Sequence, residues 1–227
     1  MSIWAIVPVK PINEAKTRLS SVLSLEQRAD LVQLLLQHTL NILTTMEELS
    51  GVLVVSADPD VWQTTYDFGA EVLKEADVPG LNQSLQRSIQ VLQDMAVNTI
   101  LIVHADLPYL TKESLLPLVS LGVERSIVAI IPDRVQQGTN VMLMSPPGII
   151  PLRYGEGSFI RHREETSHAG AYFIEIRPSP LSIDIDMPED LTAEILDLLK
   201  TLRNSCRNGG WASGGLETVK QGESQRE

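Results

Sequence analysis

Cysteine is almost absent from this sequence of 227 residues, because Cys206 is the only one. A disulfide within the chain is excluded, and so is a zinc site built from cysteine and histidine. Long apolar runs are missing too, since none approaches the roughly 20 residues needed to cross a bilayer. The apolar stretch 3–9 is too short for a signal-peptide core and lacks a basic region before it. We therefore expect a cytoplasmic protein without a membrane segment.

Basic residues are also scarce, with 18 Lys and Arg against 29 Asp and Glu and a net charge of -11. This balance argues against a nucleic-acid polymer as partner, because such binding depends on Lys and Arg that neutralise backbone phosphates. A single nucleotide is still allowed, since a local cluster of donors and a bound cation can neutralise it.

Apolar, strand-like runs alternate with helical patterns along the chain. Several of the runs are continuous rather than alternating, as expected of strands buried on both faces. The pattern predicts one α/β domain over residues 1–203, with a three-layer and mostly parallel sheet. The predicted strands are 4–9, 52–56, 70–73, 99–103, 127–131, 140–145, 171–176 and 181–184. The predicted helices are 24–44, 82–95, 112–121, 158–169 and 188–202.

Residues 204–227 differ in composition from the rest of the chain. They are rich in Gly, Ser, Gln and charged residues, and Trp211 is their only aromatic side chain. Such a segment buries too little apolar surface to order itself, so we expect a disordered C-terminal tail.

Carboxylates follow two of the predicted strands. Asp106 comes shortly after the apolar run 99–103. Asp184 and Asp186 stand two residues apart, so they share one face of an extended chain. Oxygen ligands of this kind suit Mg²⁺, which is usually held by one or two carboxylates together with substrate phosphates. The alternative is that Asp106 caps a helix and that the other two acids are solvated.

The loop after the first strand carries Lys10, Lys16 and Arg18 in an otherwise acidic protein. A strand followed by a basic loop and a helix is typical of a phosphate cradle, so these residues are candidates for binding a triphosphate. A solvated surface loop is the alternative. His104 comes shortly before Asp106, and its strand position predicts a packed, hydrogen-bonded residue rather than a base.

Six segments occur in the order seen in one enzyme family. The chain resembles the 2-phospho-L-lactate or phosphoenolpyruvate guanylyltransferases of coenzyme F-420 biosynthesis from residue 3 to about residue 200. The resemblance implies a nucleotidyltransferase fold of the sugar-nucleotide type. The segments are PVKPINEAKTRL, VPGLN, HADLP, PDR followed by GTN, GEGSF and DIDMPEDL.

The resemblance also implies roles for particular residues. The metal-binding acids of the family fall on Asp106, Asp184 and Asp186. Its contacts to the phosphorylated acid fall on Thr139, Gly155 and Ser158. Glycine allows close backbone approach, and free N–H groups at the start of a helix suit an incoming phosphate. A plain serine cap after a glycine turn is the alternative.

Gly80 and Asn82 stand where related nucleotidyltransferases contact base and ribose, although Gly-Leu-Asn before a helix is also an ordinary turn and cap. The first loop lacks the glycine-rich signature of the wider superfamily, so triphosphate binding has to rely more on Lys16 and Arg18. Lys16, Arg18 and Asp106 are accordingly the predicted catalytic residues.

The implied reaction joins the GMP moiety of GTP to phosphoenolpyruvate or 2-phospho-L-lactate and releases pyrophosphate, with Mg²⁺ as cofactor. The sequence does not distinguish the two acids, although phosphoenolpyruvate is the usual assignment for bacterial relatives. A homodimer and the hand-off of a labile product to the downstream transferase are left open. The rival hypotheses are a glycosyltransferase of similar fold, another nucleotidyltransferase of similar fold that acts on a different phosphorylated acceptor, and a nucleotide-binding module without catalysis.

Overall fold

A computed structural model describes residues 2–75, 80–121 and 126–207 of the chain. Its central feature is a seven-stranded sheet with the order β3-β2-β1-β4-β6-β5-β7. The strands are β1 (Ile3–Pro8), β2 (Gly51–Ser56), β3 (Glu71–Lys74), β4 (Thr99–Val103), β5 (Ile127–Pro132), β6 (Thr139–Ser145) and β7 (Tyr172–Glu175). Neighbouring strands are parallel except where β6 pairs with β4 and β5. The predicted mostly parallel sheet is therefore confirmed.

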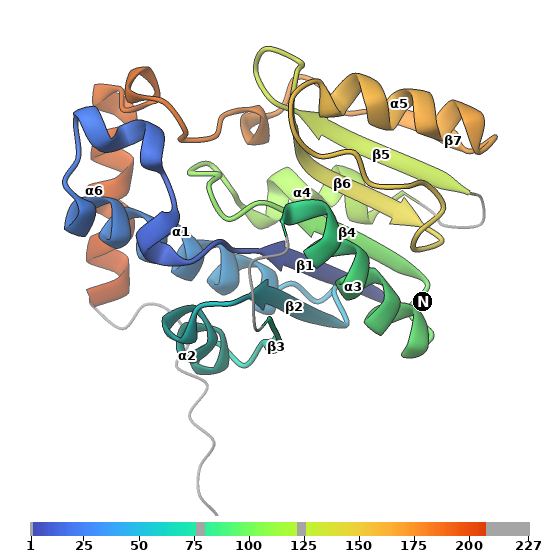
Figure 1. Ribbon diagram of the computed structural model, residues 1–227, viewed down its shortest axis with the longest axis horizontal. Helices are drawn as coiled ribbons and strands as arrows, with labels where there is room; N and C mark the ends of the chain where they lie inside the picture. The colour runs from blue at the N-terminus through green and yellow to red at the C-terminus, as the bar shows by residue number, and fades with distance from the viewer. Residues whose placement is uncertain (1, 76–79, 122–125, 208–227) are drawn as a thin grey trace, which may run out of the picture.

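Helices cover both faces of this sheet and make the three expected layers (Figure 1). One apolar core packs α1 and α4 against the sheet, and a second packs α3 and α5 against the opposite face. The helix α6 lies beside α1, at the side of the molecule away from β5 and β7 (Figure 1). The helices are α1 (Leu25–Thr44), α2 (Pro59–Asp67), α3 (Leu81–Asp94), α4 (Lys112–Val119), α5 (Ser158–His168) and α6 (Ala193–Arg207).

The double covering explains why the central strands are apolar throughout. Successive side chains of a strand point to opposite faces. In β1, Ala5 and Val7 accordingly lie in the first core, whereas Ile6 lies in the second. In β4, all five residues are buried. Both positions of the repeat must be apolar when neither face meets water.

Local signals fix several helix boundaries. Ser24 and Gln27 form the predicted capping box at the start of α1, with the Ser24 side chain accepting from the Gln27 backbone. The sequence reading missed α2, although Asp58 caps it and Pro59 occupies its first position. Helix α6 begins at Ala193 rather than at Pro188, because Thr192 caps it through the Ile195 N–H group.

Two further expectations are corrected. The predicted strand 181–184 does not form; Pro180–Ser182 make a 3₁₀ turn instead, and the Ile185 N–H group donates to the Asp106 carbonyl at 3.1 Å. The predicted tail began at residue 204, but α6 continues to Arg207. The rest of the predicted tail, with Trp211, lies outside the described residues. Among the described residues, no helix is long and apolar enough to cross a membrane.

Candidate functional site

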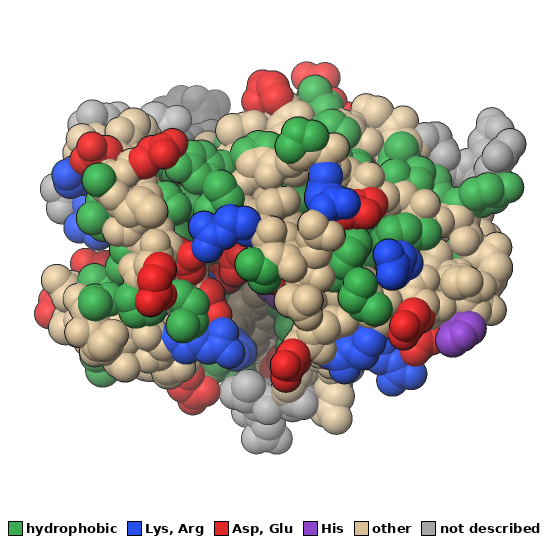
Figure 2. Space-filling view, turned by 90° about the horizontal axis from the view of Figure 1, so that it is seen from above, with side chains coloured by type: hydrophobic (Ala, Val, Ile, Leu, Met, Phe, Trp, Pro, Cys, Tyr) green, Lys and Arg blue, Asp and Glu red, His purple; other side chains and the backbone are tan. Residues whose placement is uncertain are grey.

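The candidate site lies at the edge of the sheet where β1, β2, β3 and β4 end. The antiparallel strand β6 begins at the same edge, since Val141 pairs with Val103 near the end of β4. A pocket of about 380 Å³ follows this edge. Figure 2 shows this hollow in the middle of the face, with acidic side chains along its wall and Lys or Arg side chains beside it. Ligand sites of α/β sheets are expected at such an edge.

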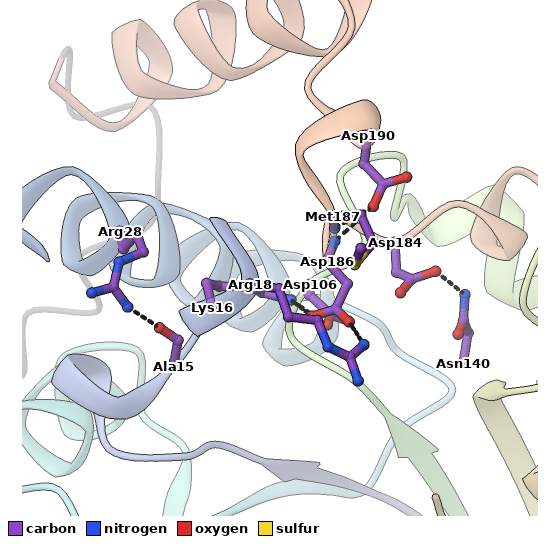
Figure 3. A network of polar contacts seen from close by, with 10 residues as sticks. All are labelled: Ala15, Lys16, Arg18, Arg28, Asp106, Asn140, Asp184, Asp186, Met187 and Asp190. Atoms are coloured by element: carbon purple, nitrogen blue, oxygen red, sulfur yellow. Dashed lines mark hydrogen bonds and ion pairs between the residues drawn. The ribbon is translucent and has the colours of Figure 1, made fainter. Parts of the chain in front are cut away.

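In and beside the pocket, basic residues of the first loop contact the predicted metal acids (Figure 3). The Lys16 ammonium donates to Asp106 Oδ2 at 2.7 Å and lies 3.9 Å from Asp186 Oδ1. Arg18 Nη1 donates to Asp186 Oδ2 at 2.5 Å. The structure thus brings together residues separated by up to 168 positions in the sequence.

The third acid, Asp184, lies on the side of this network nearest β6 (Figure 3). Asn140 Nδ2 donates to Asp184 Oδ1 at 3.4 Å and to the Leu181 carbonyl at 2.9 Å. Asp190 Oδ2 accepts the N–H groups of Asp186 and Met187 at 2.9 and 2.7 Å. These bonds fix a segment that forms no strand, so the spacing of Asp184 and Asp186 is held by side chains.

Burial and opposite charges set the protonation states of this group. Burial alone would lower the pKa of Lys16 and raise that of Asp106, but the attraction between the two outweighs it. The pKa of Lys16 therefore lies above its usual range and that of Asp106 below. Burial, together with the nearby Asp106 charge, raises the pKa of Asp184 to about 6. The group thus holds an excess of poorly solvated negative charge on the Asp184 side.

This donor set fits a hard divalent cation only in part. Asp106 and Asp184 line the same pocket, and their mutual repulsion would be relieved by a cation between them. Within the described residues, however, no three His, Cys, Asp or Glu side chains are arranged to hold a metal ion. The Lys16 ammonium lies against Asp106 instead, and Arg18 engages Asp186.

The backbone of Lys16 is unusual. Its φ of 53° places this non-glycine residue in the left-handed region, directly before the 3₁₀ turn Thr17–Ser21. Such a conformation costs about 1 to 3 kcal/mol and tends to persist where the surroundings enforce it, often at functional sites. The side chain is only 10% exposed. Strain and burial together direct the ammonium into the pocket.

The residues that the resemblance assigns to the phosphorylated acid gather at the β6 end of the pocket. Thr139, Gly155 and Ser158 all line it. Ser158 Oγ donates to Thr139 Oγ1 at 3.3 Å, and His162 Nδ1 lies 3.0 Å from the same oxygen. The turn before Thr139 is closed by Asp133, which accepts the N–H groups of Gln137 and Gly138.

His162 is a positioning residue that the sequence reading missed. Its Nε2 accepts the Arg153 N–H group at 2.9 Å, so the proton of the neutral ring lies on Nδ1 and is donated to Thr139. Burial and then the charges of Arg161 and Arg153 lower the pKa of His162 to about 3, which keeps the ring neutral. Thr139 Oγ1 then accepts two hydrogen bonds, and its own proton is free for a ligand. In the sequence, only the spacing of His162 from Ser158 on α5 could have indicated that His162 has this role.

Some predicted contacts are not supported in detail. The N–H groups at the start of α5 were expected to be free, but those of Ser158 and Phe159 donate to the carbonyls of Gly155 and Gln137. Ser158 is also not the cap of α5, since Gly157 holds that position. The polar groups left for a ligand here are therefore side-chain hydroxyls, and not the backbone N–H groups of Ser158 and Phe159.

Asn82 was expected to contact base or ribose, but both ends of its amide bond the backbone of Tyr154, at 3.1 and 2.8 Å. It joins α3 to the segment before α5 and does not line the pocket. Gly80 does line it, with φ of +91° and with no described atom within 4 Å of where a Cβ would lie. Lys10 lines the pocket as predicted, whereas Arg18 reaches the site through Asp186.

His104 lines the pocket, and burial lowers its pKa. The expectation that it is hydrogen-bonded through its ring is not met at Nε2, which has no partner among the described residues. A neutral imidazole that is desolvated in this way is poorly suited to collect a proton, which agrees with its predicted structural role.

Comparisons with known proteins give one consistent result. Residues 3–201 match the family described as "Guanylyl transferase CofC like". A phosphoenolpyruvate guanylyltransferase of Sphaerobacter thermophilus is 38% identical over 191 residues, which are 84% of this chain and 91% of that protein. A 2-phospho-L-lactate guanylyltransferase of Methanocaldococcus infernus is 33% identical over 186 residues, 82% of this chain and 81% of that protein. A solved nucleotidyl transferase from Methanothermobacter thermautotroptrophicus, 14% identical, has the same fold with a TM-score of 0.62 and covers 88% of this chain and 99% of its own.

Proposed function

Because the chain belongs to the family of CofC-like guanylyl transferases, we propose that it joins the GMP moiety of GTP to phosphoenolpyruvate or 2-phospho-L-lactate. Pyrophosphate is the second product, and the reaction is a step of coenzyme F-420 biosynthesis. The observation that carries the proposal is that Lys16, Asp106 and Asp184 line the same pocket. They lie between an end with basic residues and an end with hydroxyl groups. We put phosphoenolpyruvate first, since relatives named for it include one at 38% identity.

In the proposed reaction, a phosphate oxygen of the small acid attacks the α-phosphorus of GTP in line. One phosphorus–oxygen bond forms, and the bond to the β-phosphate breaks as pyrophosphate leaves. The acid has a second phosphate pKa near 6 and is mostly dianionic at neutral pH, so no general base is required. Burial lowers the pKa of His104 and of His162, and a lowered pKa makes each ring a weaker base, which is consistent with this.

The chain must bring two polyanions together. Lys10 and Lys16 line the part of the pocket after β1 and would attract the triphosphate, while Thr139 and Ser158 would hold the acid. Lys16 has to move its ammonium from Asp106 toward a phosphate oxygen, which its flexible stem permits. The charge that develops on pyrophosphate would then be stabilised by the same ammonium.

Mg²⁺ is the proposed cofactor. Asp106, Asp184 and Asp186 would hold it once Lys16 and Arg18 turn to the phosphates. Bound there, the ion would neutralise phosphate charge and act as a Lewis acid at the α-phosphate. A cytoplasmic location, a homodimer and the hand-off of the product to a downstream transferase stay predictions that accompany this proposal.

A pyrophosphate-release assay tests the function. Purified protein with GTP, Mg²⁺ and either acid should release pyrophosphate, and omission of the acid should abolish the release. The downstream transferase is added in excess so that a labile product is captured. Asp106→Asn should be inactive, whereas Asp197→Asn, the same change on the exposed face of α6, should match the wild type. Sugar transfer from a nucleotide-sugar without pyrophosphate release would favour the glycosyltransferase hypothesis instead.

A further inference from the structure

The pocket contains a buried carboxylate that the reaction described above does not use. Glu75 directly follows β3, lines the pocket and has a side chain that is only 5% exposed. Its backbone is fixed by a hydrogen bond from the Glu75 N–H group to the Ser56 carbonyl at 3.0 Å. Its Oε2 accepts from Ser84 Oγ, in the first turn of α3, at 2.7 Å. The side chain is therefore held in one orientation.

The second oxygen of this carboxylate lacks a hydrogen bond. Oε1 is buried and has no donor within reach among the residues that the structure describes. Arg87 Nη1 lies 3.8 Å away, beyond hydrogen-bond distance, on a side chain that is 65% exposed. A buried carboxylate oxygen without a donor is costly, and such groups are rare in native proteins. Because Glu75 lines the pocket, this oxygen is a candidate contact for a ligand.

The position of Glu75 across the sheet suggests which part of a ligand it meets. In the strand order, β3 is at one edge, β1 and β4 are central, and β6 lies beyond them. Glu75 follows β3, Lys16 and Asp106 follow β1 and β4, and Thr139 begins β6. With about 4.8 Å between strands, β3 and β4 are separated by roughly 14 Å. A nucleotide with its phosphates at Lys16 can therefore extend its base toward Glu75, on the side opposite the acid.

We propose that Glu75 is the residue that selects guanine, through hydrogen bonds from the N1–H and 2-amino groups of the base to its carboxylate. This inference rests on the proposed function and names the part of the site that chooses the nucleotide. Guanine presents these two donors side by side, and an ionised carboxylate is an acceptor only, so the two match. Adenine and cytosine place a ring-nitrogen acceptor at the corresponding position, which a carboxylate repels. Uracil offers one N–H group between two carbonyl oxygens.

The surroundings of Glu75 leave room for a base. Gly80 also lines the pocket and lies near Glu75, since the Ser84 hydroxyl reaches the Gly80 carbonyl at 3.2 Å. It has no side chain, and no described atom lies within 4 Å of the position of a Cβ there. Its φ of +91° disfavours other residues. Ser84 acts as a positioning residue, because its hydroxyl bonds Oε2 and leaves Oε1 without a donor among the described residues.

Nucleotide analogues test this assignment on the unaltered protein. Pyrophosphate release is measured with the phosphorylated acid and GTP, ITP or 1-methyl-GTP. ITP lacks the 2-amino group, and 1-methyl-GTP lacks the N1–H group. The wild type should use each analogue with a kcat/KM about tenfold to a hundredfold below that for GTP, the factor expected for one hydrogen bond to a charged group. Equal use of all three would overturn the proposal without any variant.

The variant Glu75→Gln separates recognition from a structural role. Its amide keeps one acceptor for N1–H but turns an NH₂ group toward the 2-amino group, so the ratio of kcat/KM for GTP to that for ITP should fall toward one. Glu71→Gln, the same change at an exposed position of β3, should leave the ratio unchanged. An equal loss for both nucleotides in Glu75→Gln would assign Glu75 a structural role and refute the inference.

Failure of the proposed function gives a different result. If the wild type releases no pyrophosphate from any nucleotide with either acid, the guanylyl transfer itself is wrong. Calorimetric titration of the same proteins with GTP and ITP then tests Glu75 independently of turnover. Tighter binding of GTP than of ITP by the wild type, lost in Glu75→Gln, would support the assignment; equal affinities would overturn it.

Discussion

Replacing Lys16 by methionine should show how much the central ion pair contributes to the free energy of unfolding. The Lys16 side chain is 10% exposed and that of Asp106 is 26% exposed, with 2.7 Å between the charged atoms. Removing one partner of a fully buried pair costs about 3 to 5 kcal/mol, because the other charge stays desolvated. Since Asp106 keeps some contact with water, we expect a loss of about 2 to 3 kcal/mol in Lys16→Met.

A double-mutant cycle isolates the interaction. In Asp106→Asn, Lys16 still has Asp186 at 3.9 Å, so the loss should be near 1 kcal/mol. The variant that carries both substitutions should be more stable than the sum of the single losses predicts, by about 1 to 2 kcal/mol. Urea unfolding at pH 7.5 without divalent cations measures all four proteins. Lys10→Met, an exposed lysine of the same loop, should change the free energy by less than about 0.5 kcal/mol.

The cycle also tests whether Lys16 and a metal ion alternate at Asp106. Millimolar Mg²⁺ should raise the melting temperature of Lys16→Met more than that of the wild type, because no ammonium then competes for the carboxylates. A coupling energy of zero within error, or equal shifts with Mg²⁺, would refute the reasoning.

The remaining predictions concern single residues of the pocket. Asp184→Asn and Asp186→Asn should lose most pyrophosphate release while keeping the wild-type melting temperature within a few degrees; full activity with unchanged Mg²⁺ dependence would contradict their assignment to the metal. Ser158→Ala should raise the KM for the phosphorylated acid about tenfold to a hundredfold and spare that for GTP, and equal shifts would show that the pocket has no separate acid end. His162 has its pKa lowered from 6.5 to about 3, so the unfolded state binds the proton more tightly. The stability it contributes is present above about pH 6.5 and is lost as the pH falls toward 3; His162→Gln should flatten this loss in urea titrations, and an unchanged slope would count against it.

Much of this protein could be derived from the sequence because the signals are local. Strands buried on both faces need apolar residues at every position, so β1 and β4 are visible as continuous runs. The capping box of α1 depends on residues three positions apart. Asp106 was found in the same way, since it comes shortly after the end of β4, whereas the strand expected before Asp186 does not form. The family motifs indicated Thr139, Gly155 and Ser158, which line the pocket.

Other features were decided only by the tertiary structure, because they depend on contacts between distant segments. Residues 181–184 have the composition of a strand, yet they are not part of the seven-stranded sheet. Asn140 bonds the Leu181 carbonyl instead, and the Ile185 N–H group just after the segment donates to the Asp106 carbonyl. Asn82 has the chemistry of a nucleotide contact, but the Tyr154 backbone uses both ends of its amide. The Glu75 oxygen that lacks a donor among the described residues has no sequence signature at all, since an unpaired acceptor is defined by what surrounds it.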